Sequence, residues 1–196
     1  MRITIIGASG HGKVVAEIAK LNGYDDIVFL DDNPSLISCG GYPVIGSSSR
    51  EPEGDTIVAI GNGRIRESLS EKHKLVSLIH PNAVIAEDVL IGCGTVVMPG
   101  AVINPGTTIG KGCIINTSSS VDHDCKIGDF VHIAVGAHLC GTVSVDKQTW
   151  IGAGAIINNN LRICSNCMIG AGAVVIKNID EPGTYIGIPA KKVNGG

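Results

Sequence analysis

Aliphatic residues recur at every sixth position from Ile79 to Val175, seventeen times without a miss. The residue two places before each of them is usually small, as at Ala101 and Thr107. The residue directly after it is often Gly, Asn, Asp or Ala, of which the first three tolerate a left-handed backbone. A fixed six-residue period is typical of a parallel β-helix, in which short strands stack and each coil contacts its neighbours. Ordinary strands would show turn signals every 8–12 residues instead.

This period and these residue classes resemble the hexapeptide-repeat family. The resemblance implies a left-handed β-helix of triangular section over residues 79–196, closed by a C-terminal cap, with three hexapeptides in each coil and five to six coils. Cys113, Cys125 and Cys167 occupy the small-residue positions and are expected in the core. Cys164 and Cys167 form a lone CxxC, a weak metal or redox signal without a second pair.

Residues 1–78 break the period and predict a separate domain. Buried strands alternate with helical stretches, which indicates a small parallel α/β sheet of Rossmann-like type. His73 falls at the end of the second helix, whose surface is polar, and is expected to be solvated. The predicted strands are "RITII", "DIVFLDD", "TIVAIGN" and "KLVSLIHP", and the predicted helices are "HGKVVAEIAKLNG" and "RIRESLSEKH".

A glycine-rich turn, "GASGHG", joins the first strand to the first helix. Backbone N–H groups and the helix dipole converge at such a turn, which is the arrangement that binds phosphate. Asp31 lies 24 residues after Gly7, where an acidic side chain can hold a ribose hydroxyl. The spacing Gly7-x-x-Gly10-x-Gly12 differs from the commoner dinucleotide motif, and the domain is short for a dinucleotide fold. We therefore expect a single nucleotide rather than NAD.

Composition narrows the possible partners. Hydrophobic residues make up 44% of the 196-residue chain and charged residues 17%, as in a packed globular protein. A net charge of −3 provides no basic field for nucleic acid or an acidic membrane. We find neither a signal-peptide pattern nor an apolar run long enough to span a bilayer. Seven cysteines without regular pairing fit reduced thiols, so we expect a cytoplasmic protein.

The stretch "NTSSSVDHDC", residues 116–125, stands out from the repeat because His123 lies between two aspartates. An imidazole near neutrality is suited to take a proton, and a neighbouring carboxylate can fix its tautomer. Either Asp122 or Asp124 could orient the ring. A plain solvated turn is the alternative, and three-histidine zinc binding with His132 and His138 is another. Because these two precede core aliphatics one repeat apart, they should point outward from adjacent faces, which disfavours a shared metal.

Taken together, "GASGHGKVV", "LDD", "AIGN", the hexapeptides, "NTSSSVDHDC" and "GIPAKKV" resemble the PglD, NeuD and EpsM type of sugar acetyltransferases over the whole chain. The resemblance implies acetyl transfer from acetyl-CoA, without a metal, to the C4 amine of a UDP-linked 4-amino-4,6-dideoxy sugar of the bacillosamine type. It implies a base at His123 oriented by Asp124, where the family often has Glu. The implied substrate-binding residues are Gly10, His11, Gly12, Asp31, Asp32, Gly61, Asn62 and Asn116.

The resemblance also implies a homotrimer in which acetyl-CoA lies between two β-helices. The implied acetyl-CoA-binding residues are His132, Gly141, Gly152, Ala153, Gly170, Ala171 and Lys191, with the N–H of Gly141 as the oxyanion donor and Lys191 or Lys192 near the coenzyme phosphates. Two rival functions remain: O-acetylation of sialic acid or another glycan, and a non-catalytic trimeric scaffold with a nucleotide-sensing domain. Acetyl-CoA should stabilise either enzyme against heat and should leave a scaffold unchanged.

Overall fold

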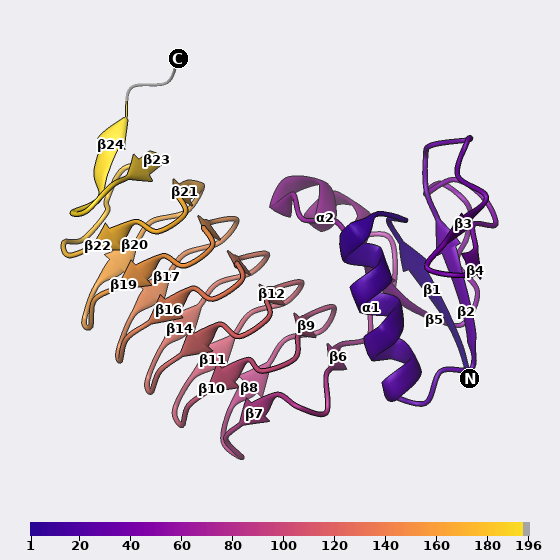
Figure 1. Ribbon diagram of the computed structural model, residues 1–196, viewed down its shortest axis with the longest axis horizontal. Coiled ribbons are helices and arrows are strands. Elements are labelled where there is room, and N and C mark those ends of the chain that lie inside the picture. The colour runs from indigo at the N-terminus through magenta and orange to yellow at the C-terminus, as the bar shows by residue number, and fades with distance from the viewer. Residues whose placement is uncertain (194–196) are drawn as a thin grey trace.

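The computed structural model, described here for residues 1–193, consists of a small α/β domain followed by a parallel β-helix (Figure 1). The first domain has a parallel sheet in the order β2-β1-β5, a short hairpin and two helices. This confirms the predicted fold class. Its elements are β1 (Arg2–Ile6), α1 (Gly10–Leu21), β2 (Asp26–Leu30), β3 (Ser38–Cys39), β4 (Tyr42–Pro43), β5 (Asp55–Val58) and α2 (Gly63–Ser70).

Three sheets form the β-helix, and we name them as its three faces. Strands eighteen residues apart are paired in parallel, for example Ile115 with Ile133, so three hexapeptides make each coil as predicted. The first face contains β6 (Leu78–Ile79), β9 (Val96–Val97), β12 (Ile114–Ile115), β15 (His132–Ile133), β18 (Trp150–Ile151) and β21 (Cys167–Ile169), extended by β23 (Gly183–Ile186) and β24 (Lys191–Val193).

The other two faces repeat the same spacing. The second face contains β7 (Val84–Ile85), β10 (Val102–Ile103), β13 (Ser120–Val121), β16 (His138–Leu139), β19 (Ile156–Ile157) and β22 (Val174–Val175). The third face contains β8 (Leu90–Ile91), β11 (Thr108–Ile109), β14 (Lys126–Ile127), β17 (Ser144–Val145) and β20 (Arg162–Ile163).

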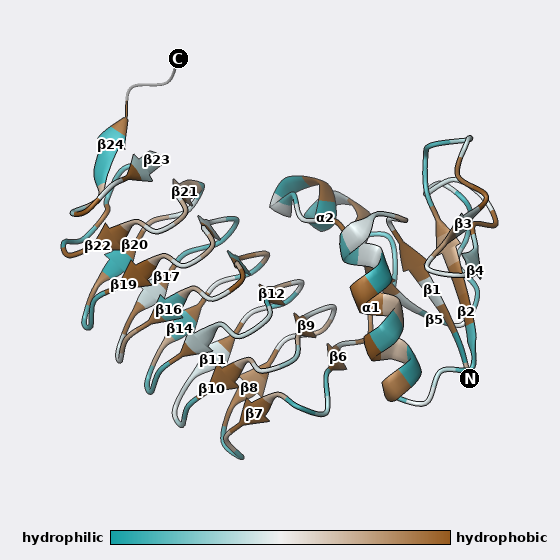
Figure 2. Cartoon of the chain, viewed as in Figure 1, coloured by the Kyte–Doolittle hydropathy of each residue, from teal (hydrophilic) through white to brown (hydrophobic). Residues whose placement is uncertain are grey.

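The predicted aliphatic positions are the second residue of nearly every strand and point into the core. Val97, Ile115, Val121 and Ile133 are fully buried there. In Figure 2 hydrophobic residues recur along the strands of successive coils. The three cysteines expected in the core, Cys113, Cys125 and Cys167, are buried as well. A solenoid built this way has one continuous aliphatic core, which explains why so few aromatic residues are needed.

The turn residues behave differently from the expectation. The left-handed residues lie three places after each aliphatic position, as at Ser118 and Asp124, rather than one place after it. The glycines directly after the aliphatic position have another purpose. A Cβ on Gly92 would lie 2.5 Å from the backbone N of Lys111 in the next coil. These glycines therefore permit close stacking of the coils.

The α/β domain packs on the lower coils of the first face. The outward residues Leu78, Val96 and Ile114 are buried in the same cluster as Ile5 and Ala59 of the α/β sheet. Further along that face the outward residue becomes His132, then Trp150, and finally Met168, which is 42% exposed. Along the β-helix, the outward residues of the first face are therefore first aliphatic and covered by the α/β domain, then His and Trp, and finally exposed to solvent.

Two smaller differences concern the second helix. Helix α2 ends at Ser70, three residues before the predicted end at His73, because Glu71 already forms its C-cap. His73 is half-buried with its Nε2 atom enclosed, so the expectation of a solvated side chain is wrong. No helix within residues 1–193 is long and apolar enough to cross a membrane.

Candidate active site

His123 and Asp124 lie in the turn between β13 and β14, at the edge between the second and third faces. The Nδ1 atom of His123 and the Oδ2 atom of Asp124 are 2.8 Å apart. Because a carboxylate only accepts hydrogen bonds, Nδ1 carries the proton and Nε2 is left with a free lone pair. Both side chains are open to solvent, 57% and 65% exposed. The pair is therefore a base and an orienting acid on the surface of the chain.

Asp124 reaches His123 because of its backbone conformation. Its φ of 58° is left-handed, which turns the carboxylate back toward the preceding ring. Its N–H donates to the Pro105 carbonyl of the coil below, and the Thr142 N–H of the coil above donates to the His123 carbonyl. A Cβ on Gly106 would lie 2.5 Å from the Asp124 carboxylate, so glycine there leaves the space that the carboxylate occupies.

Asp122 has a different task from Asp124. Its Oδ1 accepts hydrogen bonds from the Asn104 side chain at 2.7 Å and from the His123 N–H at 2.8 Å. These two hydrogen bonds hold the pKa of Asp122 below its usual range, and the bond from Asn104 has the larger effect. The pKa of His123 is raised, first by the hydrogen bond to Asp124 and then by the charge of Asp122. The structure answers the open question of orientation: Asp124 holds the ring and Asp122 holds the turn.

Gly141 faces the free nitrogen of His123. A Cβ on Gly141 would lie 2.5 Å from Nε2, so any side chain there would take the place of the ring or its substrate. Within residues 1–193 the Gly141 N–H donates no backbone hydrogen bond, although its carbonyl accepts one from Asn160. A backbone N–H without a backbone partner, on a residue next to a base, is a candidate donor to an oxyanion.

A second group of predicted residues meets at the junction of the two domains. His132 is 7% exposed, and its Nε2 lies 3.1 Å from Nδ2 of Asn116. Its ring packs on Trp150 at 4.2 Å between centroids. Burial lowers the pKa of His132 to about 3, with further lowering by Arg66 and then His11. His132 does point outward from the coil, but the α/β domain covers it, which a pattern of repeats cannot show.

His11 and Gly61 approach the same junction from the α/β domain. Burial, followed by the charge of Arg66, lowers the pKa of His11 to about 4. A Cβ on Gly61 would lie 3.5 Å from the Trp150 ring. In the glycine-rich turn, Gly12 has no room for a side chain, since a Cβ would lie 2.2 Å from the Gly7 carbonyl. The low pKa values leave both His11 and His132 neutral. The absence of a side chain at Gly12 lets α1 begin close against β1.

The predicted acidic residues already have partners in the chain. Asp31 accepts from the Ala8 N–H at 2.7 Å and so holds the glycine-rich turn, while Asp32 accepts from the N–H and hydroxyl of Ser48. Asn62 caps α2 by accepting from Arg64 and Ile65. Asp31 and Asp32 nevertheless line one side of a cavity of about 390 Å³.

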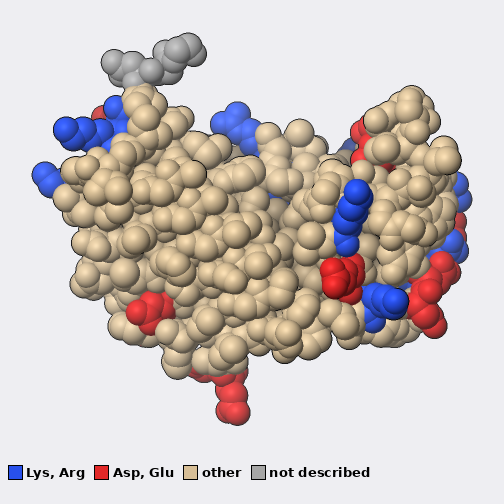
Figure 3. Space-filling view, in the orientation of Figure 1, with Lys and Arg blue, Asp and Glu red and all other residues tan. Residues whose placement is uncertain are grey.

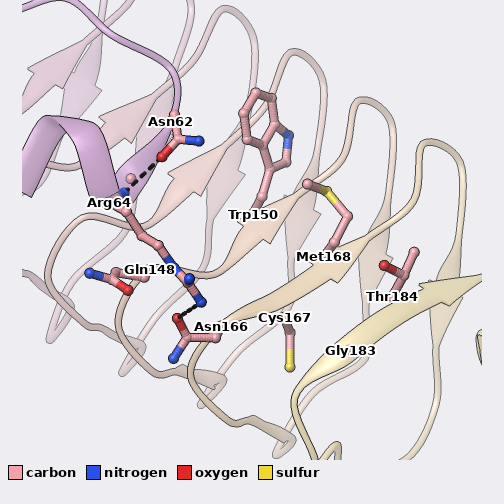
Figure 4. Close-up of a pocket in the computed structure, with 10 residues that line it drawn as sticks. Asn62, Arg64, Gln148, Trp150, Asn166, Cys167, Met168, Gly183 and Thr184 are labelled. Carbon is pink, nitrogen blue, oxygen red and sulfur yellow. Dashed lines mark hydrogen bonds between the residues drawn. The ribbon is translucent and has the colours of Figure 1, made fainter. Parts of the chain in front are cut away.

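A cavity of about 320 Å³ lies beside Asn62, between the start of α2 and the upper first face. Figure 4 shows Trp150 and Met168 projecting from the face and Arg64 reaching Asn166. Gln148 in the same cavity donates to Glu67. Among the described residues the lining of this cavity includes no histidine or carboxylate, and two of its polar side chains, Arg64 and Asn166, bond to each other.

The chain alone does not bring the two groups together. His123 and Gly141 lie at the edge between the second and third faces, directly opposite the first face that carries His132. The predicted coenzyme residues divide in the same way. Gly141 is at the edge of His123, whereas the other turn residues are at the edge between the first and second faces: Gly152, Ala153, Gly170 and Ala171.

Two of the predicted coenzyme residues, Gly152 and Gly170, are also required to be glycine by the packing around them. A Cβ on Gly152 would lie 2.5 Å from the Ile169 carbonyl, and one on Gly170 would lie 2.7 Å from the Ile186 side chain. Lys191 lines a cavity of about 280 Å³ at the end of the β-helix, together with Lys177 and Lys192. His138 is exposed, as expected, and lies 2.9 Å from the Ser120 hydroxyl on the face next to that of His132.

Comparison with known proteins extends these observations. The family model for the PglD N-terminal domain matches residues 2–73, and that for the bacterial transferase hexapeptide (six repeats) matches residues 82–123. The GDP-perosamine N-acetyltransferase of Escherichia coli O157:H7 is 33% identical over 165 residues, which cover 76% of this chain and 75% of that protein. This chain belongs to the PglD-type hexapeptide-repeat acetyltransferases.

Two further relatives of these acetyltransferases are informative. The UDP-N-acetylbacillosamine N-acetyltransferase of Bacillus subtilis (strain 168) is 35% identical over 111 residues, which cover 49% of this chain and 50% of that protein. The acetyltransferase domain of PglB from Neisseria gonorrhoeae FA1090, solved in complex with acetyl coenzyme A, is 44% identical. It covers 98% of each chain with a TM-score of 0.92.

Sequence reasoning missed several residues of the site. Asn104 and Gly106 lie a full coil before the acidic residues that they support, and only the eighteen-residue coil spacing could have related them. Trp150 could have been noticed as the only tryptophan of the chain. Nothing in the sequence distinguishes Arg66 from Arg64, the other basic residue of its helix.

Proposed function

We propose that this chain transfers the acetyl group of acetyl-CoA to the C4 amine of a UDP-linked 4-amino-4,6-dideoxy sugar, as in bacillosamine-type glycan synthesis. The observation that carries the proposal is the His123–Asp124 pair with its free Nε2 beside Gly141. The relatives from Escherichia coli O157:H7 and Bacillus subtilis (strain 168) are named N-acetyltransferases of sugars, which supports an amine rather than a hydroxyl as acceptor. The family resemblance supports UDP as the nucleotide, and a panel of UDP- and GDP-linked acceptors distinguishes the two.

The chemistry follows from the pair. Acetyl-CoA, when bound, supplies an activated carbonyl. Nε2 of His123 accepts the proton that the amine loses as it attacks that carbonyl, and the carboxylate of Asp124 stabilises the imidazolium that forms. In our proposal the free N–H of Gly141, which lies against the His123 ring, donates to the developing oxyanion. The protonated His123 can then return its proton to the leaving thiolate.

The division of residues between opposite edges supports a site shared by two copies. In our proposal His123 and Gly141 of one copy face the first face of its neighbour, which supplies His132 and Asn116. The coenzyme would lie between them, along the neighbour's edge formed by Gly152, Ala153, Gly170 and Ala171. Such a heterologous contact closes into a ring, and we propose a homotrimer. Much of the β-helix surface seen in Figure 3 is uncharged, which suits contact between copies.

The remaining residues are proposed to hold the substrates. The glycine-rich turn with Gly10, His11 and Gly12 would face the nucleotide phosphates, and the cavity beside Asp31 and Asp32 would take the base or ribose. The coenzyme phosphates would lie near the cluster of lysines around Lys191. The seven cysteines are thiols, as the reducing cytoplasm that we propose for this protein would keep them.

The proposal is tested by incubating the protein with acetyl-CoA and a panel of acceptors while free thiol is measured. The panel contains UDP- and GDP-linked 4-amino-4,6-dideoxy sugars, the matching 4-hydroxy sugars and sialic acid. We expect thiol release with the UDP-linked amine above all others. Faster release with the GDP-linked amine would correct the nucleotide, and release only with hydroxyl acceptors would overturn N-acetylation. No release with any acceptor would overturn the proposal as a whole.

A further inference from the structure

Arg66 is a charged residue that the structure buries almost completely, at 1% exposure. It lies in the middle of α2, and its guanidinium donates to four backbone carbonyls. Nη1 donates to Ile60 at 2.7 Å and to Gly61 at 2.8 Å, both in the loop that joins β5 to α2. Nε donates to Gly112 at 2.6 Å and Nη2 to Phe130 at 2.8 Å, both in the β-helix. One side chain therefore joins the two domains.

The two β-helix acceptors belong to consecutive coils. Gly112 and Phe130 are eighteen residues apart and lie at the edge between the third and first faces. Each is in the turn that leads into a strand of the first face, and His132 follows Phe130 by two residues. The planar fork of the guanidinium is needed for this arrangement, because its donors diverge in fixed directions toward separate acceptors.

No acid balances the charge of Arg66. Within residues 1–193 it takes part in no ion pair, and the adjacent Glu67 is bonded to Gln148 instead. Burial accordingly lowers the pKa of Arg66 to about 10, which still leaves it charged at neutral pH. A buried charge met only by carbonyl dipoles is costly, and an apolar side chain would pack there more cheaply. A role in holding the geometry of the neighbouring residues explains why a charge stands at this position.

The residues that Arg66 holds belong to the cleft of the proposed site, with Gly61 among the nucleotide-sugar residues and His132 among the acetyl-CoA residues. Gly61, whose carbonyl it binds, lies against Trp150, and Trp150 packs on His132. The positive charge of Arg66 also acts on His11, at the start of α1, and on His132. It adds to burial in lowering the pKa of each histidine. The guanidinium thus lies behind the cleft and does not open into it.

We propose that Arg66 is a positioning residue for acetyl transfer, whose guanidinium fixes the nucleotide loop at Gly61 against the β-helix turn that carries His132. The inference rests on the proposed function for the reaction that it serves. Arg66 need not contact the substrate in this role. The role predicts two separable effects. The four hydrogen bonds fix the geometry of the cleft, and the charge adds to burial in keeping His132 neutral.

Two variants separate these effects. Arg66→Lys keeps the charge but offers one nitrogen, which cannot reach four carbonyls, whereas Arg66→Met removes both. Arg162→Met is the matched control, because Arg162 is an exposed residue of the third face paired with Asp146. For each protein we would measure the KM of each substrate, the thermal midpoint, and the pH titration of His132 by NMR of imidazole-labelled protein.

We expect both Arg66 variants to raise the KM of the nucleotide sugar about tenfold or more, since small misplacements in a binding site are costly, and to change that of acetyl-CoA less. The His132 titration midpoint should rise in Arg66→Met and stay low in Arg66→Lys, while Arg162→Met matches the parent. The inference would be overturned if both variants kept the KM within about twofold. It would also be overturned if activity fell in step with thermal stability while the His132 titration stayed unchanged in both.

Failure of the proposed function gives a different result. In that case the parent protein would acetylate no acceptor, and no KM could be measured. The His132 titration and the hydrogen exchange of the Gly61 and Asn62 amides would still report whether Arg66 fixes the cleft. Unchanged titration and exchange in Arg66→Met would overturn the positioning role independently of activity.

Discussion

Two histidines of the predicted site, His123 and His132, lie in opposite environments. His123 is 57% exposed at an outer edge, and two carboxylates raise its pKa. His132 is buried between two domains, and burial with a nearby arginine lowers its pKa to about 3. A base has to exchange protons with solvent and substrate, whereas a neutral wall of a cleft has to keep a fixed hydrogen-bonding role. This difference is what our proposal of a shared site requires, in which a second copy covers the exposed pair.

The largest effect is expected from removing the base. His123→Ala should lower kcat/KM by about 1,000-fold, within the range typical of general-base removal. His138→Ala is the matched control, since it removes an exposed histidine of the next coil that takes no part in the proposed site. Initial rates with saturating acetyl-CoA measure both. Equal activity of the two variants would contradict the assignment of the base.

Neutralising the orienting acid should have the next largest effect. Asp124→Asn should lower kcat/KM by about 10- to 100-fold, less than loss of the base itself. Asp124 raises the pKa of His123, so the parent becomes active only as pH rises through that raised value, and the variant should become active at lower pH. A pH–rate profile tests this shift. If Asp122→Asn moved the profile further than Asp124→Asn, Asp122 would be the orienting residue.

A single methyl group at Gly141 provides a steric test. In Gly141→Ala the added Cβ would meet Nε2 of His123 at 2.5 Å, so the ring must move away from its present position. We expect kcat to fall about tenfold through misplacement of the base. The KM of the nucleotide sugar should change little, because in our proposal the nucleotide is bound by the α/β domain of the neighbouring copy and Gly141 faces only the reacting group. A variant with the parent kcat would show that the ring has another productive position.

In addition to its place in the proposed shared site, the buried histidine should affect how stability depends on pH. Unfolded histidine has a pKa of about 6.5, while burial lowers that of folded His132 to about 3. Between these values the unfolded chain binds a proton that the folded chain does not, so stability falls as pH falls from about 6.5 toward 3. His132→Gln should reduce this acid sensitivity in urea unfolding measured at pH 7 and pH 5. An unchanged difference between the two pH values would show that His132 titrates normally.

The same contrast explains how much of the molecule could be predicted from its sequence. The β-helix was predictable because each coil repeats local contacts, so the six-residue spacing of Ile115, Val121 and Ile127 already defines their burial. The pair was a candidate because His123 lies between two aspartates in a turn of the repeat, and its role as the base is our proposal. Its orientation depends on Gly106 and the left-handed backbone of Asp124, which are contacts between coils and are visible only in three dimensions.

The domain junction was less predictable for a physical reason. His132 occupies the same repeat position as exposed His138, and only the α/β domain packed over the first face makes their environments differ. Arg66 has no sequence signal, because its partners are backbone carbonyls that any residue could supply. A repeat pattern predicts what lies inside the solenoid, and it cannot predict which outward residues another domain will cover.

In our proposal the exposed base of one copy, His123, acts on substrates bound in the buried cleft of another copy. Mixing subunits tests it directly: His123→Ala and His132→Ala proteins, each nearly inactive, are unfolded together, refolded and assayed. If every site takes its base from one subunit and its cleft from the next, random assembly restores about a quarter of the parent activity. If each chain supplied a complete site, mixing would restore nothing beyond the sum of the two variants, and that result would contradict the account.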